Sequence, residues 1–244
     1  MKKILLVLGL SISLMCTLTA LKAQETYYPG YAVLNDGSRV SGKISYYADA
    51  PWFNQRYILL KDSASLAESK SDNVKPKRYR VDDLKSYQTG DRKFEKVHFV
   101  DNQNLQIKSL GSNDHMLEKL SGGRIDVYRF YSYPKDFDIY YGDYREKMAK
   151  DQKELMNGWK MLSQKDNDKL ENAFDYDLQK YFADTPEVLK KYQNGEYGNE
   201  PVSTKKGLAA KMIGLAKKAA LMPMQYETLV AAFNDYNQKN PVKK

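Results

Sequence analysis

Alternating apolar and polar residues in the first half of the chain predict a series of short β-strands. The clearest case is residues 116–131, where an apolar run, a Ser-Gly-Gly turn and a β-branched, aromatic run predict a β-hairpin. Ile125 and Val127 alternate with polar neighbours, and aromatic residues then fall on both faces. This pattern predicts a central strand that is covered on each side.

Turn signals divide the same half into further strands. Asn35-Asp36-Gly37 separates two β-prone runs and predicts a second hairpin. Asp82-Asp83-Leu84 predicts a capped turn, and polar residues 63–76 predict a mobile loop. Other strands are expected over residues 56–61, 77–81, 94–100 and 105–110, the last two as a hairpin. We expect one antiparallel barrel or roll over about residues 28–133.

After Pro134 the residue types change to those that favour helices. Helices are expected over residues 145–162, 170–182, 205–222 and 224–238. Residues 184–187, Asp-Thr-Pro-Glu, predict another helix start, and Asn194-Gly195 predicts its end. The expected fold class is α+β, with an antiparallel β domain at 24–134 and a mainly helical region at 135–244.

Residues 1–23 have the features of a secretory signal peptide. Lys2 and Lys3 precede an apolar segment, and cleavage is expected after Ala23. Removal of this segment lowers the net charge from +8 to +5 and removes Cys16, the only cysteine. Met15 and Ser13 do not fit a lipoprotein signal around Cys16. We therefore expect an exported protein of the periplasm or extracellular space, without disulfides or Cys-ligated metals.

Neither the histidines nor the paired carboxylates indicate catalysis. His98 and His115 are expected to be ordinary surface or partly buried residues, and no common hydrolase or phosphate-binding motif occurs. Asp166-Asn167-Asp168 lacks the Gly and Glu of a calcium loop. Asp82-Asp83 fits a turn better than a glycosidase pair. We expect no catalytic residue, no cofactor and no metal, and a hydrolase without a recognised motif is the weakest alternative.

A basic segment at residues 205–222 predicts an amphipathic helix with a lysine-rich face. Either this helix packs on its own domain with a solvated basic face, or it contacts anionic lipid or another polyanion. The candidate contact residues are Lys205, Lys206, Lys211, Lys217 and Lys218. Nucleic acid is not expected as a partner, because no stacking aromatic residues lie among the lysines.

Tyrosine is abundant, with 20 residues, and two clusters stand out. Amphipathic rings suit protein interfaces and sugar platforms, but they also pack at the edges of cores. The candidate interface or ligand residues are Tyr27, Tyr28, Tyr31, Tyr140, Tyr141 and Tyr144.

Several short motifs in both halves of the chain form one combined pattern. In the β half these are Gly30-Tyr31, Gly42-Lys43-Ile44 and the hairpin at 117–131. In the helical half they are residues 181–187, Tyr-Phe-Ala-Asp-Thr-Pro-Glu, and 234–237, Asn-Asp-Tyr-Asn. Together these motifs resemble a family of secreted proteins from Bacteroidetes-type bacteria. The family has no settled activity, so the resemblance implies fold and export and no catalytic residue. The lysine-rich stretch within 203–222 departs from the family pattern.

Together these features lead us to expect a non-enzymatic cell-envelope protein that binds another envelope protein. The alternative is a module that binds a small ligand or glycan through its tyrosine-rich surface.

Overall fold

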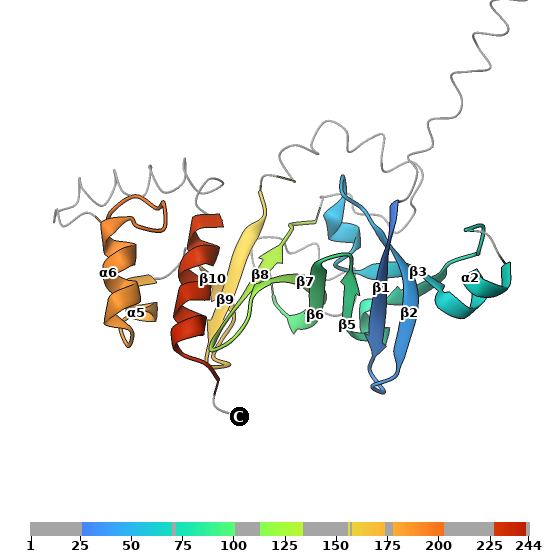
Figure 1. Ribbon diagram of the computed structural model, residues 1–244, viewed down its shortest axis with the longest axis horizontal. Coiled ribbons are helices and arrows are strands. Elements are labelled where there is room, and N and C mark those ends of the chain that lie inside the picture. The colour runs from blue at the N-terminus through green and yellow to red at the C-terminus, as the bar shows by residue number, and fades with distance from the viewer. Residues whose placement is uncertain are drawn as a thin grey trace, which may run out of the picture.

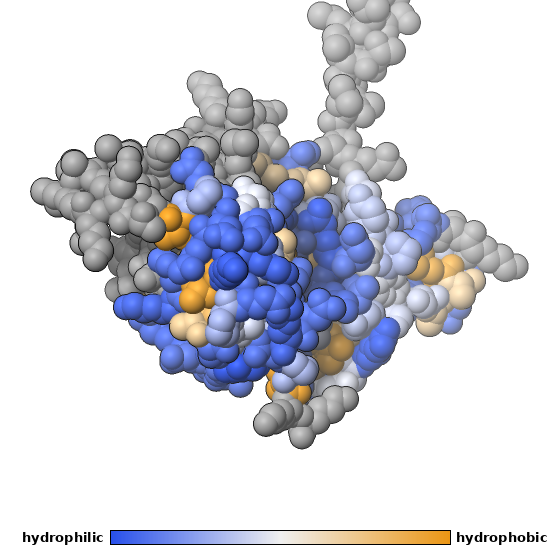
Figure 2. All heavy atoms as spheres, turned by 60° about the vertical axis from the view of Figure 1, so that its left-hand side comes forward, coloured by the Kyte–Doolittle hydropathy of each residue, from blue (hydrophilic) through white to orange (hydrophobic). Residues whose placement is uncertain are grey.

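The computed structural model describes residues 26–69, 72–100, 113–133, 156, 158–173, 178–202 and 227–242. These residues form an α+β fold dominated by one antiparallel sheet of ten strands (Figure 1). The helical segments at 178–181, 186–194 and 227–239 lie beside β8–β10, whereas the helix at 63–69 lies beside β2 and β3. The surface on the side of the C-terminal helices is mostly hydrophilic (Figure 2). The strands are β1 (Thr26–Leu34), β2 (Arg39–Tyr46), β3 (Tyr57–Asp62), β4 (Lys77–Arg80), β5 (Leu84–Thr89), β6 (Arg92–His98), β7 (Asp114–Ser121), β8 (Ile125–Phe130), β9 (Lys160–Lys165) and β10 (Glu171–Asn172). The helices are η2 (Pro51–Phe53), α2 (Ser63–Ser69), η3 (Val81–Asp83), α5 (Leu178–Tyr181), α6 (Pro186–Asn194) and residues 227–239.

The strands follow the order β10-β9-β8-β7-β6-β5-β1-β2-β3-β4. β10 and β4 are therefore the edges of the described sheet, which is not closed into a barrel. β4 is four residues long and carries Lys77, Arg78 and Arg80 on both sides of the buried Tyr79. A short, charged edge of this kind discourages pairing with the strands of other molecules.

β8 is covered on both faces, as its sequence predicts. Ile125 and Val127 pack in a cluster with the helical elements, including Phe182 and Phe233. Tyr128 and Phe130 point to the opposite face and pack in a second cluster, which is rich in aromatic residues and also contains Tyr131. The predicted hairpin is thus confirmed as β7–β8, in the interior of the strand order.

Two glycines face each other across β1 and β2. Gly30 is paired with Gly42, and a Cβ atom on either would lie 2.0 Å from a backbone oxygen of the next strand. The oxygen belongs to Gln88 of β5 for Gly30 and to Lys61 of β3 for Gly42. These positions therefore exclude every side chain, because a backbone oxygen cannot move away as a flexible side chain can.

Local turn and capping signals predicted several boundaries correctly. The β1–β2 hairpin turns at residues 35–38, with Gly37 at a φ of +86°. α6 begins with Pro186 after Thr185 and ends at Gly195, which has a φ of +76°. η3 confirms the turn expected at Asp82-Asp83, where Asp83 accepts a 2.8 Å hydrogen bond from the Arg80 backbone N–H.

The helices predicted over 145–162 and 170–182 are wrong at residues 160–162 and 171–172, because two strands occupy these positions. β9 pairs with β8 from Lys160 to Lys165, and β10 continues the sheet. The apolar residues Met161 and Leu162 fit a helical stripe in sequence, but pairing with the open edge of β8 decides their conformation. The sheet therefore continues beyond residue 134, and only residues 178–181 of the second prediction are helical.

Two further predictions need correction. Residues 63–69 of the loop expected at 63–76 form the helix α2. Asp62 stabilises its first turn, because its carboxylate accepts hydrogen bonds from the backbone N–H and the hydroxyl of Ser65. The strand at 94–100 pairs with β5 and β7. Its expected partner at 105–110 lies outside the described residues. β5, which sequence patterning missed, fills the place between β6 and β1.

Candidate functional site

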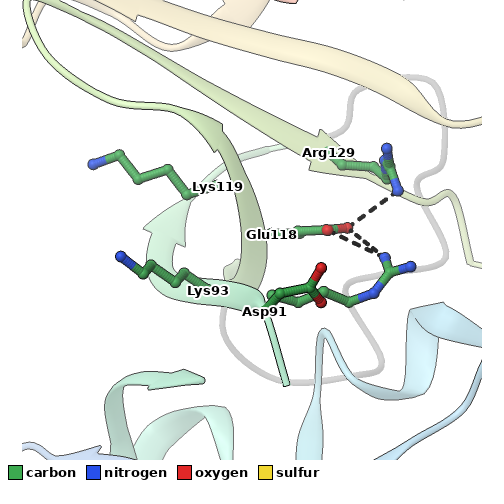
Figure 3. A pocket seen from close by; sticks show the side chains of 6 residues that line it. Asp91, Lys93, Glu118, Lys119 and Arg129 are labelled. Atoms are coloured by element: carbon green, nitrogen blue, oxygen red, sulfur yellow. Dashed lines mark hydrogen bonds and ion pairs between the residues drawn. The ribbon is translucent and has the colours of Figure 1, made fainter. Parts of the chain in front are cut away.

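A small hollow in the surface of the sheet is built around two arginines and one glutamate. The strand register places Glu118 of β7 beside Phe94 of β6 and Arg129 of β8. Arg92 Nη1 and Arg129 Nη1 donate to the Glu118 carboxylate at 3.1 and 3.2 Å (Figure 3). The hollow measures about 270 Å³.

Aromatic rings orient both guanidinium groups. Arg92 lies over the ring of Tyr46 at 4.6 Å, and Arg129 lies over the ring of Trp159 at the same distance. Burial raises the pKa of Tyr46 to about 12 and also raises the pKa of Tyr131. Both phenols therefore remain protonated at neutral pH, and neither adds negative charge beside the arginines.

Other charged residues at the hollow point elsewhere. The side chains of Lys93 and Lys119 are directed away from Glu118 in Figure 3. Lys119 instead pairs with Glu95 and Asp126, both at 3.0 Å. What remains in the hollow is a pair of oriented cations around one carboxylate, an arrangement that suits binding of an anionic group.

Sequence reasoning did not single out Arg92, Glu118 or Arg129. They belong to three different strands, and only the strand register brings their side chains together. One signal was present in the sequence: Glu118 falls between Met116 and Leu120 on the otherwise apolar side of its strand. A carboxylate at such a position requires a cationic partner.

The first predicted tyrosine cluster lies in β1, divided between the two faces of the sheet. Tyr27 and Tyr31 point away from the core that contains Ala32, and each contacts a cation. Arg39 lies 3.6 Å above the Tyr31 ring, and Lys61 lies 4.5 Å from the Tyr27 ring. Tyr28 has the opposite orientation and is 42% exposed.

Strand pairing adds Lys43 to the side of the sheet that carries Tyr27 and Tyr31. Lys43 is paired with Lys61 across β2 and β3. The Lys43 ammonium contacts the Asp72 carboxylate at 2.6 Å, and the Lys61 ammonium donates to the Asp72 backbone oxygen at 2.7 Å. We call the surface formed by these five side chains the basic tyrosine face; it consists of Tyr27, Tyr31, Arg39, Lys43 and Lys61. Within the described residues, Asp72 is the one carboxylate that forms an ion pair with any of the three cations of this face.

The remaining predicted contact residues cannot be placed in the fold. Tyr140, Tyr141 and Tyr144 lie outside the described residues, as do Lys205, Lys206, Lys211, Lys217 and Lys218 of the basic segment. Lipid or polyanion contact by that segment stays a prediction. Among the described residues, no helix is both long and apolar enough to cross a membrane.

The two histidines make ordinary hydrogen bonds. His98 is exposed and lies 2.8 Å from the Asp114 carboxylate. His115 is fully buried, rather than partly buried as predicted, between the Tyr133 hydroxyl at 2.8 Å and the Phe99 carbonyl at 3.1 Å. In the described part of the chain, no group of three His, Cys, Asp or Glu residues could hold a metal ion.

Asp166 and Asn167 form a tight turn after β9, with φ values of 54° and 61°. Asp166 accepts two hydrogen bonds from Arg124, at 2.7 and 2.6 Å, and this bidentate contact lowers its pKa. A carboxylate held by arginine is not available to calcium, which agrees with the missing Gly and Glu in the sequence.

The helical motifs join the C-terminal helix to the sheet. Asp184 accepts a 2.8 Å hydrogen bond from Tyr236 and pairs with Lys165 of β9 at 2.9 Å. The Asn237 side chain accepts from the Ile125 backbone N–H at 2.8 Å and donates to its carbonyl at 2.7 Å. These residues have a structural role, because each polar group holds an element of the fold in place.

The contacts of the Asp235 carboxylate lead us to expect that the folded protein loses stability in acid. Partial burial opposes its ionisation, but hydrogen bonds from Tyr197 at 2.5 Å and Lys191 at 3.0 Å lower its pKa overall. A lowered pKa stabilises the fold above the unfolded value of about 4, and this contribution disappears as the pH falls through the folded value.

Asp235→Asn should therefore lower the free energy of unfolding by about 1 kcal/mol at pH 7 and have little effect at pH 2. Urea unfolding at several pH values measures the difference. Glu68→Gln, at an exposed position of α2, is the control. An equal loss of unfolding free energy in Asp235→Asn at both pH values would contradict a lowered pKa of Asp235 in the folded protein.

No protein-family model, no curated protein and no solved structure matches this chain.

Proposed function

We propose that this protein is an exported, non-enzymatic cell-envelope protein that binds an acidic surface of another envelope protein. The observation that supports this function is the basic tyrosine face, which combines three cations with two aromatic rings on the outer side of β1–β3. Arginine and tyrosine are enriched at protein interfaces, and an excess of cations favours a partner of opposite charge. The signal peptide and the resemblance to secreted proteins supply the compartment in this proposal.

Cation stacking also favours protein binding over sugar binding. A sugar platform needs a free ring face, whereas Arg39 covers a face of the Tyr31 ring at 3.6 Å. The alternative of a glycan or small ligand is favoured by one ring, Tyr28, which is 42% exposed. A saturable rise in melting temperature with a soluble glycan, lost in Tyr28→Ala, would support that alternative.

We also infer that the N-terminal part of the sheet curls into a roll. Tyr79 of the edge strand β4 and Met116 of β7 share one buried cluster, although five strands separate them in the strand order. The Met116 backbone N–H donates to the Gln55 carbonyl at 2.9 Å. Such curvature would turn the basic tyrosine face outward as the convex side of the roll.

Site-specific cross-linking in cells tests the proposed function. A photoreactive residue at Ser41, which is exposed beside Tyr31, should capture one stoichiometric partner with an acidic surface. The same group at Asn234, exposed on the C-terminal helix, is the positional control. The double variant Arg39→Glu/Lys61→Glu should reduce capture at least about tenfold, because it reverses two charges at the contact.

Lys180→Glu/Lys190→Glu is a matched control that reverses two exposed charges of α5 and α6. It should leave capture unchanged. Equal capture from Ser41 and Asn234, or equal loss in both double variants, would refute a role for the basic tyrosine face.

A further inference from the structure

The hollow around Glu118 contains more positive than negative charge. Arg92 and Arg129 share the carboxylate of Glu118. The side chain of Arg92 is 37% exposed, that of Arg129 is 24% exposed and that of Glu118 is 13% exposed. Asp91 is exposed at the rim and makes no ion pair within the described residues. Asp91 attracts Arg92 at longer range, but Glu118 is the one carboxylate of the hollow within ion-pair distance of the two arginines among the described residues. Two partly buried cations that share one close carboxylate favour a further anion in the hollow.

The hydrogen-bonding groups lead to the same conclusion. Each guanidinium group has five N–H donors, and each arginine contacts Glu118 through Nη1 alone. Arg129 also interacts with the Tyr131 hydroxyl. Arg129 Nε is buried and has no hydrogen-bond partner among the described residues. Buried donors are rarely left unpaired in folded proteins, so this nitrogen indicates a missing acceptor.

We propose that the hollow between Arg92 and Arg129 binds a carboxylate group. The planar guanidinium fork matches a carboxylate in a bidentate manner, and stacking on Tyr46 and Trp159 fixes the planes of the two forks. The volume of about 270 Å³ lies just below the range of about 300–1,000 Å³ that is typical of pockets for drug-sized ligands. The site therefore accepts a small organic acid or one acidic side chain of a larger ligand.

This inference is independent of the proposed function. Glu118 lies opposite Phe94, on the side of the sheet that carries the Ala32 core, whereas the basic tyrosine face lies on the other side. A ligand in the hollow and a partner at Ser41 would thus contact different surfaces.

NMR of the arginine Nε–Hε groups tests the proposal directly. Sodium acetate supplies the carboxylate group alone, and a capped tetraglutamate peptide supplies it on a polypeptide; sodium chloride keeps the ionic strength constant. We expect a saturable shift of the Arg129 Nε–Hε signal with at least one of the two probes. Acetate alone is sufficient if the ligand is a small acid, and a response only to the peptide identifies an acidic side chain.

Arg129→Gln should raise the dissociation constant at least about tenfold, because it removes a charged donor. Lys93→Gln removes the same charge from a side chain directed away from Glu118, and it should leave binding unchanged (Figure 3). If urea unfolding shows that Arg129→Gln is not folded, Arg92→Gln takes its place with the same expected loss, read from the Arg129 signal.

A purely structural role for the two arginines predicts different results. In that case neither probe gives a saturable shift, or chloride alone gives the same shift as acetate. Equal loss of binding in Arg129→Gln and Lys93→Gln would show only a general effect of charge. Each of these results overturns the proposal.

Discussion

Gly42→Ala is expected to lower the free energy of unfolding by about 3 kcal/mol. The new Cβ would lie 2.0 Å from the Lys61 backbone oxygen and 2.9 Å from the Asp62 Cα. Both atoms belong to β3, which pairs with β2 at this position. Relief of the clash requires the strands to separate, and their backbone hydrogen bonds are then lost. Chemical denaturation with urea, analysed as a two-state transition, measures the difference.

Ser41→Ala is the matched control for Gly42→Ala. It changes the preceding residue of β2, whose side chain is exposed. Its effect should stay within about 0.5 kcal/mol of zero. If Gly42→Ala is as mild as this control, the close approach of β2 and β3 does not constrain the fold.

Asn237→Ala is expected to cost about 2–3 kcal/mol of unfolding free energy. The Asn237 amide pairs with both the N–H and the carbonyl of Ile125, and it also donates to the Ser121 hydroxyl at 3.0 Å. The Asn237 side chain thus makes the same pair of hydrogen bonds to Ile125, beside the β7–β8 turn, that a neighbouring strand would make. Alanine leaves the two Ile125 backbone groups without these bonds while the helix still covers them.

Asn234→Ala provides a close control, since it removes the same type of side chain from an exposed position of the same helix. Urea unfolding of both variants should show a large loss for Asn237→Ala alone. Hydrogen exchange should also become faster at the Ile125 amide in that variant. Equal stability of the two variants would contradict a stabilising role for the hydrogen bonds between Asn237 and Ile125.

The parts of the fold that local chemistry specifies could be predicted from the sequence. Gly37, Pro186 and Gly195 mark turns or caps by their own conformational preferences, and the structure has boundaries there. The β7–β8 hairpin was equally clear, because β-branched and aromatic residues follow two turn glycines.

Pairing between distant segments could not be predicted in the same way. The apolar residues around Met161 fit a helix or a strand, and the edge of β8 decides between them. Tyr27 and Tyr31 were identifiable as candidates, but the cations on their rings depend on the registers of β2 and β3. The hollow at Glu118 depends on three strands at once, and no local signal specifies that combination.

The hydrogen bonds between Asn237 and Ile125 join residues 112 positions apart in the chain. Contacts with such a large sequence separation form late, because the long intervening segment loses conformational entropy when its ends meet. Until Phe233 and Tyr236 arrive, Ile125 and Val127 present an uncovered apolar strand surface. We therefore expect a chain truncated before the last helix to expose this apolar surface, to aggregate more readily than the full chain and to be a substrate for chaperones and proteases.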